Sequence, residues 1–547
     1  MKIRHLIAQT SVLLRQSGFW ATALLTIGTT VALSLVLGTD NTLPSGSPLA
    51  QWLWFDRTAP IAGGCILLSA LVALGMKVKT CSFSVAVSRA FMILGAAEAV
   101  WGLCQLYGWA MSGHAQYVTT GSFFNPGPYA GYLALTLPIC FHSWLTVSSF
   151  NKHLSGLALV LILCILPATM SRSAWVAAAV SCLWVYGCLK GWKMQFVRQW
   201  HTHRRRTGLV IAGGIAGLLI AGSLLFMLKP DSARGRLFMW KISGRALAEK
   251  PWTGQGIGQF SAAYGKAQEE YFAQRTYATW EERVAGSPEY AFNEYLQAAV
   301  ETGIPATILM LALLGAGWYK GVREKRYGIC GSILSLMVFG ISSYPMQFPA
   351  FILSLLFLWG ACMGMNNLRS RCMLALAVSI CGGMRFSTDH TQAEACRKWM
   401  NARVLYRAEA YEAAAESYAD LYPLLKSEGA FLFEYGHTLH KLKQHAASNR
   451  YLQEAMLHSS DPMILNIIGK NHWEMKDYPT AELWLLRAVN RLPGRIYPYY
   501  LLAKLYAEPD FHQPEKQARM KRIVLTKTPK VHSTAIEQMR RELKGDE

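Results

Sequence analysis

Two arginines stand where this sequence could bind an anion. Arg172 begins an apolar run in Thr169-Met170-Ser171-Arg172-Ser173-Ala174-Trp175, and Arg236 lies in Gly235-Arg236-Leu237-Phe238-Met239-Trp240. Arg172 is at the end of a predicted membrane span, where a charge is costly unless it is paired or used. An arginine that only snorkels to the membrane surface is the alternative for Arg172.

An acidic segment follows in Tyr290-Ala291-Phe292-Asn293-Glu294-Tyr295-Leu296-Gln297 and Val300-Glu301-Thr302-Gly303-Ile304-Pro305. Glu294, Gln297 and Glu301 fall at helical spacing on the outer half of a run predicted to cross the membrane. One face is therefore polar where lipid would not tolerate it. We expect this face to line a cavity or to pair with an arginine, and a purely structural Glu–Arg pair is the alternative.

Two glycine-rich segments accompany these residues. Gly254-Gln255-Gly256-Ile257-Gly258 resembles a nucleotide-binding motif only superficially, because no βαβ unit surrounds it, and a glycine-hinged turn is predicted. Residues 121–133 (GSFFNPGPYAGYL) form a turn-rich approach to another apolar run, near Glu98, Gln105 and His114. His114 fits a loop histidine better than a base.

Cysteine usage predicts no metal site. Eleven of the 12 cysteines lie in or beside apolar runs, and the sequence has no CxxC pair and no Cys/His metal-ligand spacing. We therefore expect small buried packing residues, no metal and no cofactor.

The elements that position these residues follow from the composition. The 547 residues are 52% hydrophobic and only 16% charged, where a soluble protein carries about 25% charge. A bilayer-spanning helix needs about 20 apolar residues. Ten runs fit, and the shorter run 372–384 is a possible eleventh; the ten are 17–38, 59–76, 84–109, 128–149, 154–170, 172–190, 207–228, 293–316, 327–343 and 348–365.

The net charge of +21 is explained by membrane topology. Residues 1–385 carry 31 Lys and Arg against 13 Asp and Glu, in clusters that fall on one side if every run crosses. Cytoplasmic loops collect Lys and Arg, so no nucleic-acid partner is predicted. The opposite side receives the long loop 229–292. The region after residue 384 shares that side if 372–384 crosses and is cytoplasmic if it does not.

Residues 386–547 contain a pattern that recurs along the chain. Successive copies are 34, 33 and 34 residues long, and the third is the clearest, with Leu465, Ile468, Gly469, His472, Ala481, Leu485, Ala488 and Pro493. The pattern resembles the tetratricopeptide repeat family. Such an array offers a concave surface to a protein partner, or it only caps the membrane domain. The predicted fold is all-α: a polytopic transmembrane bundle of about 10–11 helices at 1–385, then an α-solenoid of tetratricopeptide-like repeats at 386–547.

Together the motifs resemble the O-antigen ligase and polymerase family of bacterial surface glycan assembly. The resemblance covers roughly residues 15–365 and rests on the order and spacing of 121–133, 171–173, 236–256, 292–303 and Ser343-Tyr344-Pro345. It implies a metal-independent glycosyltransferase that moves a glycan from undecaprenyl pyrophosphate to an acceptor hydroxyl. The acceptor would be a lipid A-core sugar, a growing glycan chain or a protein side chain.

The resemblance also implies residue roles. Arg172 and Arg236 match the family's two arginine positions and would bind the pyrophosphate, because guanidinium groups bind phosphate oxygens bidentately. Phe292 stands where family ligases commonly have a histidine that is thought to assist acceptor deprotonation. Either a neighbour such as Glu294 or Glu289 is the base, or an oxocarbenium-like transition state needs little base help. The expected substrate-binding residues are Asn293, Gln297, Glu301, Arg245, Asn125 and Tyr344.

Two classes of function are therefore compared. The first is a multi-pass ligase or polymerase of the bacterial inner membrane, in contact with membrane lipid, whose active-site loop and repeat domain are periplasmic. The second is a transporter or flippase of a lipid-linked or anionic glycan that breaks no bond. A transporter would favour charges at mid-membrane and an inverted repeat, and the sequence shows neither.

Overall fold

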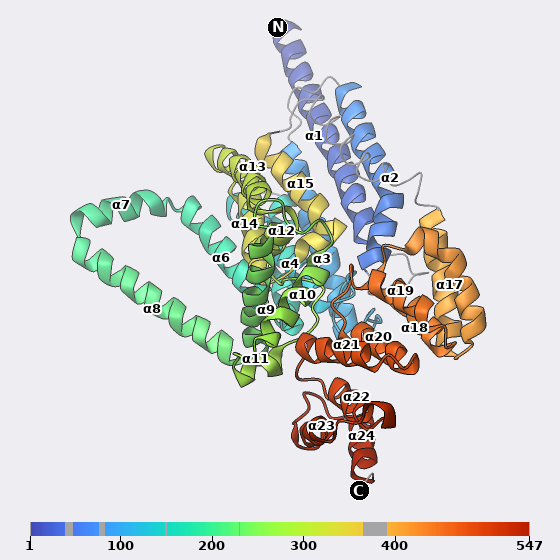
Figure 1. The fold of residues 1–547 in the computed structure, drawn as a ribbon. Helices are drawn as coiled ribbons and strands as arrows, with labels where there is room; N and C mark the ends of the chain where they lie inside the picture. The colour runs from blue at the N-terminus through green and yellow to red at the C-terminus, as the bar shows by residue number, and fades with distance from the viewer. Residues whose placement is uncertain are drawn as a thin grey trace. The chain divides into compact units, whose positions relative to one another are not determined.

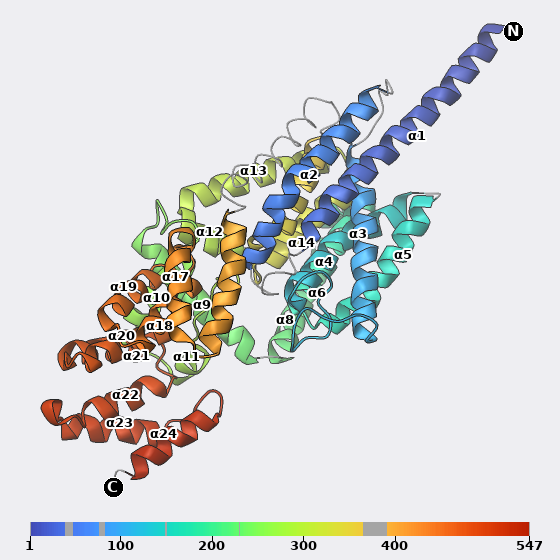
Figure 2. The same cartoon turned by 90° about the vertical axis from the view of Figure 1, so that its right-hand side faces the viewer.

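The computed structural model describes residues 2–38, 48–75, 83–147, 150–228, 230–364 and 391–545, and every regular element in these ranges is a helix (Figures 1 and 2). The chain divides into two compact units. One comprises Met1–Leu225 with Leu309–His390, and the other comprises Phe226–Ile308 with Thr391–Glu547. The long loop thus shares a unit with the C-terminal region rather than with the helices that flank it in sequence.

The first unit is the multi-pass membrane part of the protein. Within the described residues, five helical segments are long and apolar enough to cross a membrane: Trp20–Leu37, Phe83–Leu106, Asn151–Thr169, Arg172–Leu189 and Ile304–Arg323. The elements that lie wholly or mostly in this unit are α1 (Lys2–Leu37), α2 (Pro48–Gly75), α3 (Phe83–Leu106), α4 (Pro126–Thr146), α5 (Phe150–Ile165), the 3₁₀ turn η1 (Leu166–Thr169), α6 (Arg172–Leu189), α7 (Trp192–Thr202), α8 (Arg204–Leu228), α13 (Ile304–Arg323), α14 (Tyr327–Gly340), η2 (Pro345–Gln347) and α15 (Pro349–Met363).

Small residues let α4, α6 and α14 pack at the centre of this unit. A Cβ on Gly131 would lie 2.3 Å from the Phe339 ring, and one on Gly331 would lie 2.5 Å from Val185. Close approach at glycine is the usual way in which membrane helices associate, because lipid gives apolar side chains no reason to prefer one another.

The predicted run 293–316 is the one that the structure divides. It forms α12 (Glu294–Thr302) and α13, separated by Gly303 at φ +84°. Glycine after a helix and proline at the start of the next are common stop and start residues, and Gly303-Ile304-Pro305 supplies both. Glu294, Gln297 and Glu301 therefore lie on a separate short helix before the span, and the placement on the outer half of the span was wrong.

The second unit contains the loop helices and the C-terminal helices. The loop supplies α9 (Pro230–Glu249), α10 (Phe260–Ala273), α11 (Thr279–Val284) and α12. Residues 391–407 are also helical, and α17 (Tyr411–Leu425), α18 (Gly429–Lys441), α19 (His445–Ala455), α20 (Pro462–Glu474), α21 (Tyr478–Arg491), α22 (Tyr497–Leu505), η3 (Pro509–Phe511), α23 (Pro514–Thr526) and α24 (Thr534–Gly545) follow.

Two successive helix pairs in the C-terminal region pack in the same way. A Cβ on Gly436 of α18 would lie 2.7 Å from Leu452 of α19, and one on Gly469 of α20 would lie 2.8 Å from Leu485 of α21. The glycines and the leucines are each displaced by one repeat length, and the pairs lie side by side in Figure 1. Naming these hairpins tetratricopeptide repeats stays a prediction. The run 372–384 and the predicted boundary at 385/386 lie outside the described residues.

Helices α10 and α21 join the loop to the C-terminal region. Leu492 belongs to the same buried cluster as Phe238, Tyr264 and Phe272 of the loop. Gly265 allows the close approach, because a Cβ there would lie 2.5 Å from the Arg491 guanidinium.

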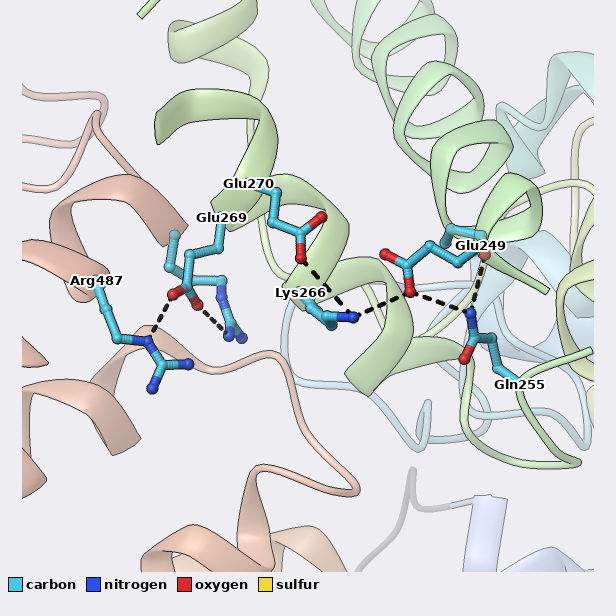
Figure 3. Close-up of polar contacts among 8 residues, drawn as sticks. Glu249, Gln255, Lys266, Glu269, Glu270 and Arg487 are labelled. Atoms are coloured by element: carbon cyan, nitrogen blue, oxygen red, sulfur yellow. Dashed lines mark hydrogen bonds and ion pairs between the residues drawn. The ribbon is translucent and has the colours of Figure 1, made fainter. Parts of the chain in front are cut away.

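A buried ion pair forms the polar part of this contact. Glu269 accepts hydrogen bonds from Arg487 Nε at 2.6 Å and from Arg491 Nη2 at 2.8 Å (Figure 3). The Gln268 amide donates to the Arg491 carbonyl at 2.5 Å. The loop and the C-terminal helices therefore share one core.

Candidate active site

Arg236 lies against the ring of Phe292. Its guanidinium carbon is 5.6 Å from the centroid of the Phe292 ring, a cation–π distance. Phe292 has φ +49°, a left-handed conformation that is unusual for an aromatic residue and turns the chain into α12. Arg236 comes from α9, and the Phe292 ring that it lies over comes from the strained turn before α12.

Asn293 and Glu294 form the start of α12. Asn293 is the N-cap, and its side-chain oxygen accepts from the Leu296 N–H at 3.0 Å. Glu294 is the first helical residue, where the helix dipole favours a negative charge. Burial raises the pKa of neighbouring Tyr295 to about 12, and the negative charge of Glu294 contributes to the rise. The capping amide thus fixes where the Glu294 backbone lies.

Gln297 and Glu301 hold the loop between residues 250 and 260, here the glycine-rich loop, on α12. Gln297 is 4% exposed, accepts from the Ala291 N–H at 3.1 Å and donates to Glu301 Oε1 at 3.3 Å. Burial raises the pKa of Glu301, although hydrogen bonds from the backbone of Gly258 and Phe260 and from Gln297 act in the opposite direction. Both side chains are engaged in fixing the fold of this segment.

The glycine-rich loop is a turn that packs on the end of α12. Gly254, Gly256 and Gly258 all have positive φ, at +72°, +111° and +76°. Gly254 is also confined by space, because a Cβ there would lie 2.3 Å from the Glu301 carbonyl oxygen. The Gly256 N–H donates to the same carbonyl at 3.0 Å. The three glycines are therefore required by the turn.

Arg245 lies on the other side of α9 from Arg236. Nine residues at about 100° each place the two side chains roughly 180° apart. The Arg245 guanidinium stacks on the Tyr271 ring of α10 at 4.6 Å and donates to Gln274 at 3.4 Å. The structure thus brings Arg236, Asn293 and Glu294 to one end of α12 and directs Arg245 toward α10.

A network that the sequence reasoning missed supports α9 from the α10 side. Lys241 bonds Glu281 at 2.6 Å and the Tyr271 hydroxyl at 2.7 Å, and that hydroxyl donates to Glu281 at 2.6 Å. The hydrogen bond from Lys241 and those from Tyr271 and Ala278 outweigh burial and lower the pKa of Glu281. Nothing in the sequence spacing connects these residues, since they come from three separate helices or turns.

The remaining candidates lie in the first unit. Arg172 is the first residue of α6, where free backbone N–H groups also favour an anion. Asn125 caps α4 by accepting from the Gly127 N–H at 2.9 Å. The Tyr344 ring is tilted against the Phe348 ring at 5.7 Å between centroids, and Phe348 also contacts Phe124 at 5.9 Å. Asn125 and Tyr344 therefore flank one aromatic cluster, and α4 also packs against η1, just before Arg172.

Glu98 and Gln105 fold the segment that precedes α4. Gln105 Oε1 accepts from the backbone N–H groups of Thr120 and Gly121, both at 2.8 Å, and Glu98 accepts from the Ser122 N–H at 3.1 Å. His114 lies in the exposed part of the same loop, where its ring nitrogen accepts from the Gln116 N–H at 3.0 Å. Residues 121–133 thus owe their turn to buried polar side chains of α3.

Comparison with known proteins points to one family. Residues 157–311 match the family model described as O-antigen ligase, a stretch that includes Arg172, Arg236 and Glu294. No protein of curated function matches the chain. The match supports the ligase family, which comprises glycosyltransferase-like ligases acting on lipid-linked glycans, and with the apolar helices it indicates a multi-pass membrane glycan ligase.

Proposed function

We propose that the protein transfers a glycan from undecaprenyl pyrophosphate to an acceptor hydroxyl at the outer face of the bacterial inner membrane, without a metal ion. The observation that carries this proposal is the position of Arg236 and Glu294 at the far end of α12. That helix leads through Gly303 directly into the α13 span, whose Ile304 N–H donates to the Pro251 carbonyl at 2.8 Å. Nine residues of helix are about 13 Å long, so Glu294 is about that distance along the chain from the start of the span, which supports a site near the diphosphate of a membrane-bound lipid.

The proposed reaction is a displacement at the anomeric carbon. The acceptor oxygen bonds to that carbon, the bond from the carbon to the diphosphate oxygen breaks, and the electron pair leaves with the diphosphate. Arg172 and Arg236 stabilise the charge that develops on this leaving group. Glu294 accepts the acceptor proton, or, in an oxocarbenium-like path, takes it late from an acceptor that is already bonded.

Phe292, Gln297 and Glu301 have positioning roles in this proposal. Phe292 offers a ring face to the Arg236 guanidinium, which keeps that cation partly desolvated and strengthens its attraction to phosphate. Gln297 and Glu301 fix the glycine-rich loop against α12. Asn293 keeps its cap, Asn125 and Tyr344 are assigned to the glycan side of the first unit, and Arg245 to the α10 side of the second.

We also propose that the C-terminal helices are tetratricopeptide-like repeats that face the same compartment as the loop. The ion pair of Glu269 with Arg487 and Arg491 requires both segments to be on one side of the membrane. If α13, α14 and α15 each cross, the end of α15 is on the other side, and one more crossing is needed. The sequence predicts that crossing at 372–384, which favours a periplasmic C-terminal region.

A reconstituted transfer assay tests the proposal. Purified protein in lipid nanodiscs is given an undecaprenyl-pyrophosphate glycan and an acceptor, and cleavage and transfer are both measured. Arg172→Ala and Arg236→Ala should each lower the transfer rate by about 10²–10³-fold, as loss of an oxyanion-stabilising donor does. Arg407→Ala is the control, because Arg407 is an exposed arginine of the C-terminal region.

Two outcomes would overturn the proposal. Transfer by both arginine variants at the wild-type rate would remove the arginines from the reaction. Movement of intact lipid-linked glycan across sealed vesicles without cleavage would show a transporter. Ligase and polymerase are then separated by the glycan ladder of a deletion strain: a single attached repeat indicates a polymerase, and full-length glycan left on the carrier indicates a ligase.

A further inference from the structure

A groove in the second unit is not part of the candidate active site. It lies between α10, the glycine-rich loop and the C-terminal helices α19 and α21, and has a volume of 470 Å³. Its lining includes Gln255, Gln259, Lys266, Gln453, Trp484 and Arg487. The volume is within the range of about 300–1,000 Å³ that binding sites for small ligands occupy. We call it the α10 groove.

The charges of the α10 groove are balanced by one another. Glu269 is held by Arg487 and Arg491, and Lys266 contacts Glu249 at 3.1 Å and Glu270 at 3.8 Å (Figure 3). A site for a phosphate or another polyanion would show unmatched positive charge instead. The paired charges therefore favour a ligand that is polar but carries little net charge.

The rest of the lining provides a flat ring and amide groups. The Arg487 guanidinium stacks at 4.4 Å on the Trp484 ring, which restrains the indole, and Met456 and Leu457 add apolar surface beside it. Gln453 of α19 is exposed, and Gln259, which precedes α10, is half-buried. A pyranose ring carries apolar C–H faces that pack on an aromatic ring, and adjacent hydroxyls that one planar amide can bind by both its donor and its acceptor.

The glycine-rich loop connects the groove to α12. The backbone N–H of Gln255, which lines the groove, donates to the Val300 carbonyl at 2.7 Å, and the Gln255 side chain donates to the Ala246 carbonyl of α9 at 3.0 Å. The same short loop thus touches the groove, the helix of Arg236 and the end of α12. A chain of several sugars that reacts near Glu294 would be long enough to extend into the groove.

We propose that the α10 groove binds an uncharged, hydroxyl-rich segment of the glycan, a few sugar units from the reacting end. This inference rests on the proposed function, since it names a second contact with the same substrate. Its consequence is a preference for long chains: a glycan that fills the groove is held at two places, whereas a single repeating unit is held only at the reacting end. The C-terminal region supplies one wall and so takes part in choosing the substrate.

Binding of released glycan to the full-length protein in nanodiscs tests the proposal. The probe is the polysaccharide released by mild acid from wild-type cells, separated into single repeats and long chains. Gln453→Ala and Trp484→Ala should each weaken binding of long chains by about tenfold. Transfer of a single repeating unit should stay at the wild-type rate.

The controls keep the result interpretable. Gln453 is an exposed surface residue, so its replacement leaves the fold intact even if Trp484→Ala loosens Arg487. Gln538→Ala removes a similar exposed amide from α24 and should bind long chains as the wild type does. Equal affinity of Gln453→Ala, Gln538→Ala and wild type for long chains would overturn the proposal. It would also be overturned if the groove bound a peptide and not glycan, and if Gln453→Ala weakened that peptide binding.

The test separates this inference from the proposed function. If transfer depends on Arg172 and Arg236 but the groove variants transfer glycans of every length at the wild-type rate, the proposal for the groove is refuted and the proposed function stands. Groove-dependent binding without any cleavage of the lipid-linked donor would support the groove and refute the transferase.

Discussion

Replacing Glu269 with alanine should open the contact between α10 and α21. Glu269 is bonded by both Arg487 and Arg491, and Arg491 is only 4% exposed. The substitution leaves a buried guanidinium without its carboxylate, which is costly because the charge has already been removed from water. Burial already lowers the pKa of Arg491, in spite of Glu269, which is the direction expected for a cation in a poorly hydrated place.

The cost can be bounded from the contacts that remain. Removing one member of a buried ion pair costs about 3–5 kcal/mol. Arg491 keeps a hydrogen bond to the Ser460 carbonyl at 3.4 Å, and Arg487 is one-third exposed and can return to water. We therefore expect about 2–4 kcal/mol. At 2–4 °C per kcal/mol for a unit of this size, the unfolding temperature of the second unit should fall by about 4–16 °C.

Hydrogen exchange in nanodiscs locates the effect. A loss of about 2–4 kcal/mol should speed exchange in peptides from residues 260–273 and 478–491 by about 30- to 1,000-fold. Peptides from α4 and α14 in the first unit should be unchanged.

The neighbouring residue provides the control. Glu270 is exposed and only approaches Lys266 at 3.8 Å, so Glu270→Ala should cost less than about 0.5 kcal/mol. Equal exchange in Glu269→Ala and Glu270→Ala would show that the ion pair does not hold the two segments together. The double variant Glu269→Leu with Arg491→Met should recover part of the loss, because an apolar pair leaves no buried charge.

Three further predictions concern the candidate active site. Phe292→Ala should slow transfer by about 2- to 30-fold, because it removes the ring that contacts Arg236, and Phe292→Trp should be close to wild type. Equal transfer rates of Phe292→Ala and wild type would show that the ring does not assist Arg236. Gly303→Ala should cost at least about 1–3 kcal/mol and make the glycine-rich loop sensitive to protease, whereas Gly286→Ala, which meets open space, should not. Because burial raises the pKa of Glu301, the glycine-rich loop should lose stability as the pH rises through that pKa. Hydrogen exchange of the loop, corrected for the intrinsic exchange rate, should show this pH dependence in the wild type and lose it in Glu301→Gln. An unchanged pH dependence in Glu301→Gln would assign it to another group.

The sequence predicted the membrane part of the fold well, because long apolar runs leave few alternatives. Within the described residues each of the ten runs coincides with helix for most of its length, and five helices are long and apolar enough to cross a membrane. The error at 293–316 arose because hydropathy averages over a break. Gly303 followed by Pro305 was the available signal, and a positive φ at a single glycine is enough to separate a polar helix from a span.

The candidate site was predictable only in part. Residue type and order indicated Arg236 and Glu294, but the contact between Arg236 and Phe292 depends on a turn whose conformation the sequence does not reveal. The opposite placement of Arg245 needed the phase of α9. The contact between α10 and α21 joins residues more than 200 positions apart, and no local pattern encodes such a pairing.

The shared core of the loop and the C-terminal region has a consequence for biosynthesis. Residues 226–308 are made before the residues that complete their core, and a further 184 residues must be added before Leu492 is in place. At about 5–20 residues per second, this leaves the core of the loop incomplete for roughly ten to forty seconds. During that time Glu269 has no arginine and Leu492 has not arrived, so the loop is a substrate for chaperones and proteases. A chain that stops before Leu492 never closes this core, and the contact therefore forms only in chains that extend past α21.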